Sequence, residues 1–230
     1  MKMPAKAAAI SALLLACGGW ARAAESGPAP ANFPVASVYF EQNATDGDSE
    51  VVFEVKGGKD GLAELTVVSP DGRTVVAFRA PDASTLGIRQ FRFESPEPTD
   101  IKSLKAAYPE GIYQFSGKTV AGARLIGKAK LSHKLPAITA VLTPAPKATN
   151  VPARGLKVSW SAVKGVASYL VGIKQPESNA SFTAQVPASA TSFAVPEGFL
   201  APGKKYHVSI GTVTGEGNTS FVESTFATAK

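Results

Sequence analysis

The stretch Leu200-Ala-Pro-Gly-Lys-Lys-Tyr-His-Val-Ser-Ile210 decides how the second half of the chain is interpreted. A leucine and a proline precede Tyr206, which opens a run in which every second residue up to Ile210 is apolar. Apolar residues two positions apart are typical of a strand with one buried face. The same alternation occurs upstream, along 156–160 and along 169–173. The pattern predicts antiparallel β-structure with short strands and many turns.

Together these strands resemble a fibronectin type III domain. In that family a tyrosine near the edge of the sandwich bonds through its hydroxyl back to the main chain. The resemblance covers about residues 138–229 and implies a seven-stranded, immunoglobulin-like sandwich. It assigns structural roles to five residues: Trp160, Tyr169, Leu200, Pro202 and Tyr206.

The first half also predicts successive strands, from Val35 to about Leu135, with a hairpin signal at Pro70-Asp-Gly-Arg73. One short helix is expected over 99–108, because its apolar residues recur at helical spacing. The segments 108–117 and 131–136 resemble a domain found beside fibronectin type III modules in uncharacterised bacterial exported proteins. The fold class predicted is therefore all-β, with two tandem antiparallel β-sandwiches, the first carrying the helix.

The predicted organisation has four parts. Residues 1–23 are interpreted as a signal peptide and 24–34 as a disordered or extended linker rich in proline and small residues. The N-terminal sandwich then covers 35–135 and the fibronectin type III domain covers 136–230. Because the connection near 136–144 is short, we expect the two sandwiches to meet end to end with restricted hinge motion.

The leader allows two processing routes. Lys2 and Lys6 precede an apolar segment, and the small residues near Ala23 favour cleavage between Ala23 and Ala24. Alternatively, Leu14-Leu-Ala-Cys17 resembles a lipobox, and Cys17, the only cysteine, would then carry a lipid. The first route predicts a periplasmic or secreted protein and the second a membrane-anchored lipoprotein. With Cys17 removed or lipidated, the mature fold has no disulfide.

Charge argues against nucleic-acid binding. The formal net charge is +6, but without Lys2, Lys6 and Arg22 of the leader the chain has 21 basic and 18 acidic residues. The remaining basic residues form no stripe with interleaved aromatic residues, which binding to a phosphate backbone would require.

Residues suited to catalysis are sparse. The two histidines, His133 and His207, lie in different predicted domains, and neither has a cysteine or second histidine nearby. No nucleophile elbow, phosphate-binding loop or dinucleotide fingerprint occurs, and 57–61 is interpreted as a glycine-rich turn. We therefore expect no enzyme activity and no cofactor.

The one candidate metal site is an acidic segment, Glu41-Gln-Asn-Ala-Thr-Asp-Gly-Asp-Ser-Glu50. Calcium prefers several oxygen ligands from one loop, but the spacing here does not match an EF-hand. A solvated turn explains the same residues, since Asp-Gly favours tight turns. The weak calcium candidates are Glu41, Asp46, Asp48 and Glu50.

The sequence thus indicates an exported, non-catalytic module of a bacterial envelope that binds or spaces other components through protein–protein contacts. Its expected partner is an envelope or extracellular protein. A polysaccharide is the alternative partner and an uncharacterised hydrolase a third reading. A membrane is a partner only if Cys17 is lipidated. Polysaccharide binding needs exposed aromatic residues in a row, whereas Trp160 and Tyr169 are expected in the core.

Overall fold

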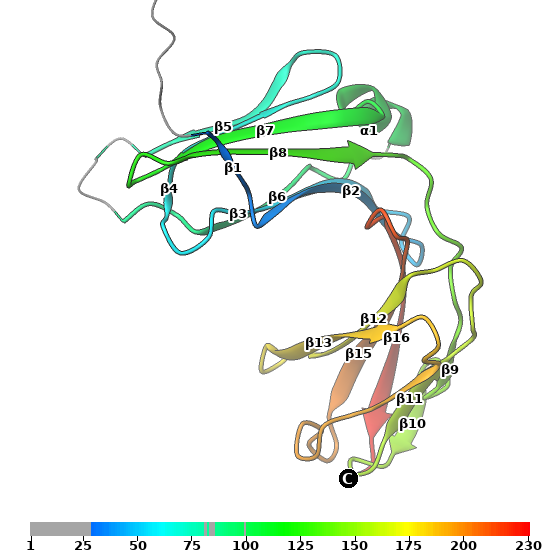
Figure 1. Ribbon diagram of the computed structural model, residues 1–230. Helices are drawn as coiled ribbons and strands as arrows, with labels where there is room; N and C mark the ends of the chain where they lie inside the picture. Colours follow the sequence, from blue (N-terminus) through cyan, green and yellow to red (C-terminus); the bar gives the residue numbers. More distant parts are fainter. Residues whose placement is uncertain (1–28, 81, 83–85, 99) are drawn as a thin grey trace, which may run out of the picture.

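The computed structural model describes residues 29–80, 82, 86–98 and 100–230. Within these residues the regular structure is strands and one short helix, which confirms the all-β prediction (Figure 1). In the same residues no helix is both long and apolar enough to cross a membrane.

The N-terminal half packs two sheets around one core. The five strands of one sheet are, in spatial order, β1 (Ala31–Asn32), β8 (Arg124–Leu131), β7 (Gly111–Thr119), β4 (Leu62–Val68) and β5 (Thr74–Arg79). Facing it are β2 (Val35–Asn43), β3 (Ser49–Lys56) and β6 (Gln90–Glu94). Alternate apolar residues of both sheets, such as Phe40, Leu65 and Tyr113, are fully buried between them. Helix α1 (Ile101–Ala107) begins at Asp100, whose carboxylate accepts from Lys102 N, and adds Leu104 to this core.

The C-terminal half has a second core and a second pair of sheets. Three short strands, β14 (Ser192–Ala194), β11 (Lys157–Trp160) and β9 (Val141–Thr143), form one sheet. Opposite them lie β13 (Ala180–Pro187), β12 (Ser168–Gln175), β15 (Lys205–Val213) and β16 (Thr219–Thr228). Trp160, Tyr169 and Tyr206 are among the largest side chains enclosed between the sheets. Hence the residues assigned to this core by sequence do lie in it.

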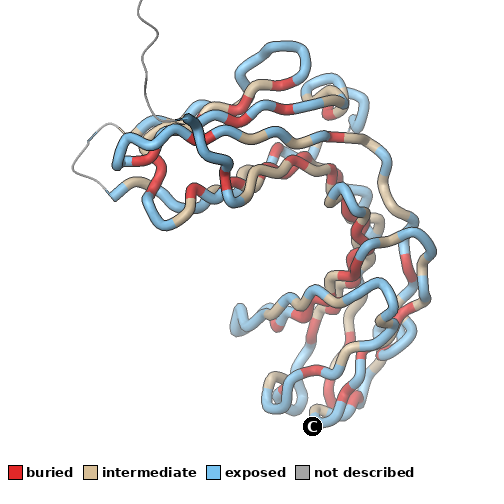
Figure 2. Tube along the Cα trace, in the orientation of Figure 1, coloured by how far each residue is buried: buried red, intermediate tan, exposed pale blue. Residues whose placement is uncertain are grey.

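One sheet runs through both halves. β16 pairs in parallel with β2 over three residues, from Thr219 opposite Glu41 to Phe221 opposite Asn43. The strand order is therefore β13-β12-β15-β16-β2-β3-β6. Figure 1 shows the two halves meeting at one end to form an arch, with this sheet along its inner side. The shorter sheets cover its outer side, and Figure 2 shows the buried residues of both cores following the arch.

The structure adds strands at two places where sequence predicted none. In the segment 24–34, expected to be a disordered or extended linker, Ala31–Asn32 form β1 beside β8 and Phe33 is buried in the N-terminal core. In the segment 145–152, β10 (Ala148–Val151) pairs in parallel with β16. Both strands add an edge to a sheet already present, and a two-to-four-residue strand has too short a pattern for sequence to register.

Three buried tyrosines bond to the main chain just upstream. The Tyr206 hydroxyl accepts a hydrogen bond from Ala201 N at 2.7 Å, as the sequence predicted. The Tyr169 hydroxyl accepts from Val163 N at 2.7 Å, and the Tyr113 hydroxyl donates to Pro109 O at 3.1 Å. A ring that is buried while its hydroxyl fixes a neighbouring loop connects the core to the edge of each sandwich.

Tyr206→Phe should lower the free energy of unfolding by about 1–3 kcal/mol, because the Ala201 N–H is left without its acceptor. Urea unfolding measures this loss. The exposed neighbour exchange Lys205→Ala serves as control and should shift the midpoint much less. Equal midpoints for Tyr206→Phe and the parent would show that the bond contributes nothing to stability.

Candidate functional site

The inner face of the arch is one free sheet surface. Directly paired residues point to the same side of a sheet, so the pairing of Glu41 with Thr219 places their side chains on one face. The opposite face of the same strands carries Phe40 and Phe226 into the two cores. The face bearing Glu41 is therefore continuous across the junction and is covered by neither of the outer sheets.

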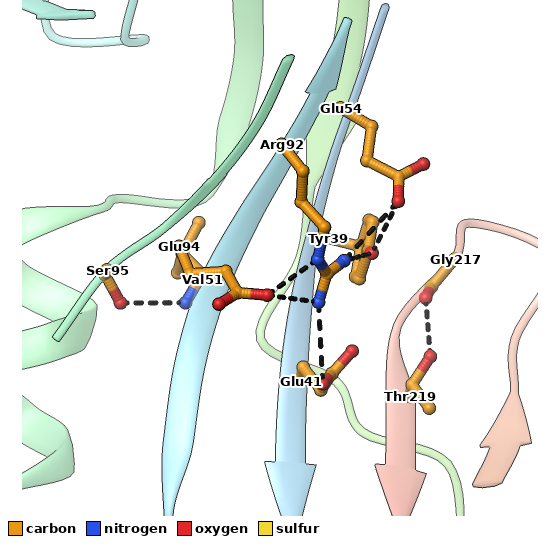
Figure 3. A network of polar contacts seen from close by, with 9 residues as sticks. All are labelled: Tyr39, Glu41, Val51, Glu54, Arg92, Glu94, Ser95, Gly217 and Thr219. Carbon is orange, nitrogen blue, oxygen red and sulfur yellow. Dashed lines mark hydrogen bonds and ion pairs between the residues drawn. The ribbon is translucent and has the colours of Figure 1, made fainter. Parts of the chain in front are cut away.

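Arg92 organises the part of this face that belongs to the N-terminal half (Figure 3). Its guanidinium lies 2.6 Å from Glu94, 3.4 Å from Glu54 and 3.9 Å from Glu41. It also donates to the Tyr39 hydroxyl at 2.5 Å, and that hydroxyl donates to Glu54 Oε1 at 3.3 Å. These residues come from β2, β3 and β6, so three strands must align before the cluster exists.

Carboxylates outnumber the arginine, and this changes their acidity. Burial, together with the negative charges of Glu94 and Glu41, raises the pKa of Glu50 to about 7, although Arg92 opposes this shift. Burial likewise raises the pKa of Glu41, although Arg92 lowers it. Burial raises the pKa of the Tyr39 phenol well above its ordinary value. The cluster thus holds more negative charge than its cation balances, and it binds protons near neutral pH.

The Glu50 shift predicts a pH effect on stability. The folded pKa lies above the unfolded value of 4.5, so the folded state binds more protons between pH 4.5 and about 7. The contribution of Glu50 to the free energy of unfolding therefore falls as pH rises through this window. Glu50→Gln removes the effect and should be more stable than the parent at pH 8, by about 1–2 kcal/mol, a value reduced because solvent screens this half-buried side chain.

The check is urea unfolding of both proteins from pH 4 to pH 8. Near pH 4 the two should be almost equal, because Glu50 is then protonated in both states. An exchange at an exposed carboxylate of the other half, Glu197→Gln, should leave the parent's pH dependence unchanged. Parallel curves for Glu50→Gln and the parent would contradict the prediction.

The buried side chain of Asn218 lies at the junction of the two halves and forms hydrogen bonds across it. It is 1% exposed, and its Oδ1 accepts from Phe40 N of β2 at 2.9 Å. Its Nδ2 donates to the carbonyls of Ser132 at 2.9 Å and Lys134 at 3.0 Å. One amide therefore joins the terminal turn of the C-terminal half, a strand of the N-terminal half and the connecting segment. No role was assigned to Asn218 from the sequence.

The connecting segment is held along its length. Ser220 Oγ donates to Pro136 O at 2.9 Å, and Thr212 Oγ1 donates to Ala137 O at 2.9 Å. Across the junction, Glu223 N donates to Thr45 Oγ1 at 2.7 Å, and Ala44 N donates to Phe221 O at 2.9 Å. These bonds join the two halves and the segment between them in the arrangement that the structure shows.

A polar hollow occupies the C-terminal part of the inner face. It has a volume of about 460 Å³, and Gly172 is one of its lining residues. A Cβ at Gly172 would meet Ser209 Oγ, so a larger residue at this position would displace that hydroxyl and fill part of the hollow. Lys174, His207 and Glu223 line the rim. The hollow can accept a polar side chain of a partner.

The acidic segment 41–50 divides between two environments. Glu41 and Glu50 are paired across β2 and β3 and belong to the Arg92 cluster. Asp46 lies in the turn, where its carboxylate accepts from Asn43 Nδ2 at 2.8 Å and from Asp48 N at 3.2 Å. In the part of the chain that the structure describes, no group of three or more His, Cys, Asp or Glu side chains could hold a metal ion. The structure thus gives the four calcium candidates no common position around an ion.

The histidines lie apart. His133 Nε2 is 2.8 Å from Tyr108 O, and its ring packs against Phe40 at 5.4 Å, beneath the junction. His207 lies on the inner face, where it is paired with Lys174 of β12. Its outward direction agrees with the alternation of β15.

The remaining predicted residues are structural or lie outside the described part. Trp160 and Tyr169 are buried with their rings 5.4 Å apart, Leu200 is 5% exposed, and Pro202 lies at the exposed start of the Tyr206 turn. Because their rings are enclosed, Trp160 and Tyr169 cannot stack on a sugar. Cys17, Ala23 and Ala24 lie outside the described residues.

No family model matches this chain, and no curated protein sequence matches it. Solved structures do. The FN1–FN3 domains of chicken CNTN1 are 15% identical with a TM-score of 0.33, and the match covers 88% of this chain and 66% of that one. A two-domain fibronectin type III segment of chicken tenascin is 16% identical, with a TM-score of 0.33, over 86% of this chain and 99% of that one. The fibronectin(III)-like modules of Clostridium thermocellum CbhA are 10% identical, with a TM-score of 0.33, over 85% and 91%.

The fold is fibronectin type III-like. In the C-terminal half a three-stranded sheet, β14-β11-β9, faces a four-stranded one, β13-β12-β15-β16, as in a sandwich of that kind. The Tyr206 bond at the start of β15 is the tyrosine corner of that fold. A shared fold gives no reaction or ligand, so function must be argued from the surface.

Proposed function

We propose that this protein is an exported, non-catalytic module that binds a partner protein along the inner face of its arch and holds that partner at a fixed angle. The observation that carries this proposal is the continuous sheet, since β16 pairs with β2 and Asn218 bonds to both halves and to their connection. Two sandwiches joined only by a flexible linker would present independent surfaces. Here the two sandwiches present one continuous surface.

The chemistry of the inner face supports a protein as the partner. The Arg92 cluster carries surplus carboxylates, which favour lysine or arginine side chains. The hollow beyond the junction offers Lys174, His207, Glu223 and hydroxyl groups to polar side chains. A surface with both features selects a partner by charge and shape.

Photo-crosslinking in a producing bacterium tests this function. A photoreactive residue replaces Gln90 or Lys174 on the inner-face strands, and the matched control replaces Lys128, which is exposed on the outer sheet. We expect both inner positions to crosslink the same protein and the control not to. Crosslinks from Lys128 alone, or different products from the two inner positions, would contradict the proposal.

Export is proposed from the leader and has its own test. The intact mass of the protein recovered from an exporting host should correspond to a chain that begins at Ala24. A mass that begins at a lipidated Cys17 would instead indicate a tethered protein. A mass that retains the leader would contradict export by either route.

A further inference from the structure

The inner sheet ends in the C-terminal half at an edge strand, β13, whose outer edge is unpaired among the described residues. β13 is the terminal strand, and among the described residues it pairs only with β12, in an unbroken register from Ala180 to Pro187. An unpaired edge presents main-chain donors and acceptors to any strand that approaches, and edges are ordinarily blocked by charge, proline or a bulge. Residues 180–186, Ala-Ser-Phe-Thr-Ala-Gln-Val, contain none of these, and the one proline of β13 is its last residue, Pro187. The opposite edge strand, β6, carries Arg92 and Glu94.

The side chains of β13 are incompletely covered on the core side. Phe182 and Val186 pack against the C-terminal core but remain half-buried. The Phe182 ring lies 4.8 Å from Phe199 and 5.8 Å from Phe193 and forms the rim of an aromatic group. On the other face Thr183 is exposed. An added strand would cover this apolar rim with alternate residues of its own.

We infer that β13 pairs antiparallel with β13 of a second copy, about a two-fold axis at Thr183. Such a pairing is isologous, so one segment must complement itself. With Thr183 opposite Thr183, Phe182 lies opposite Ala184 and Ala180 opposite Val186, so each large apolar residue meets a small one on the core side. On the exposed side Ser181 lies opposite Gln185, and no like charges meet.

The alternation of β13 selects this register. A shift by one residue would place core-side residues opposite exposed ones, which removes every apolar pair. A shift by two toward Phe182 or toward Ala184 retains the faces, but it leaves part of residues 180–186 without a partner and replaces the large–small pairs by Phe opposite Phe or Phe opposite Val. The Thr183 register alone uses all seven residues. It joins two inner sheets into one and is independent of the function proposed above.

Sedimentation of the mature chain from Ala24 tests the pairing. We expect a monomer–dimer equilibrium between about 5 and 200 µM, because a single strand pair is a modest interface. Thr183→Lys places two ammonium groups opposite each other at the axis and should weaken dimerisation at least tenfold. Gln90→Lys is the control, since Gln90 is an exposed residue of the opposite edge strand, and it should dimerise like the parent.

Cysteine crosslinking tests the register itself. Thr183→Cys would be the sole cysteine of the mature chain, and its two copies would lie directly opposite, within the range of Cα separations that a disulfide spans. Gln185→Cys would face Ser181 and should crosslink far more slowly.

Three outcomes would overturn the inference. These are a monomer at every concentration, a dimer that Thr183→Lys leaves intact, and equal crosslinking of the two cysteine variants. In the first of these cases, if an added extended peptide protected the amides around Thr183 from hydrogen exchange, the edge would be assigned to a different partner. Loss of partner crosslinks from Gln90 or Lys174 would bear on the inner face alone.

Discussion

Replacing Asn218 by alanine is expected to lower the free energy of unfolding by about 3–5 kcal/mol and to uncouple the two halves. The exchange leaves the N–H of Phe40 and the carbonyls of Ser132 and Lys134 without their partner, in a position that is 1% exposed. Each buried main-chain group that loses its bond costs about 1–3 kcal/mol. These bonds join the halves, so their loss should turn one unfolding transition into two.

Two probes separate the halves in this experiment. Trp160 is the only tryptophan of a chain that begins at Ala24, so its fluorescence reports the C-terminal core. Far-ultraviolet circular dichroism reports strands of both halves. In the parent the two signals should change together, and in Asn218→Ala they should separate. Gln114→Ala removes an exposed amide from the outer sheet and should alter neither signal. Coincident transitions with an unchanged midpoint in Asn218→Ala would contradict the role assigned to this amide.

Trp160→Ala should destabilise the C-terminal half by about 3–5 kcal/mol, because it opens a large cavity in a closed core. Trp160 is 1% exposed and packs with its ring 5.4 Å from that of Tyr169. Its Nε1 is buried and has no hydrogen-bond partner among the described residues, so its contribution comes from packing alone. Urea unfolding followed by circular dichroism measures the loss.

The conservative exchange Trp160→Phe separates packing from polarity. Phenylalanine retains an aromatic contact with Tyr169 and removes an N–H that has no partner, so we expect less than half of the loss seen with alanine. If both exchanges cost the same, the indole nitrogen rather than the packing of the ring would be the decisive group.

Sequence predicted those features that depend on neighbouring residues. Tyr206 and the donor of its hydrogen bond, Ala201 N, are five residues apart, so the local resemblance to a fibronectin type III domain indicated the corner. A related signal, Pro109 and Gly111 before Tyr113, is present in the first half and could have indicated the bond from Tyr113 to Pro109. The short strands β1 and β10 gave no alternation to detect.

The features that sequence did not predict depend on distant pairing. Asn218 reads locally as a turn residue, whereas its partners lie 84–178 residues away. Arg92 reads as a charged residue on an alternating strand, and only the order β2-β3-β6 brings it to Glu41 and Glu54. Such sites become visible when the strand order is known, because register and not composition determines which charges meet.

The bond between Asn218 and Phe40 also bears on the order of folding. Phe40 N belongs to one of the first strands, but its acceptor is made 178 residues later. During synthesis or export from the N-terminus, the edge of β2 at the junction therefore stays open until the turn before β16 has emerged. Closing so long a loop is slow. The N-terminal sandwich should thus form its core first, while the edge of β2 remains unpaired and able to pair with other chains. A chaperone that covers this edge should therefore raise the yield of folded protein.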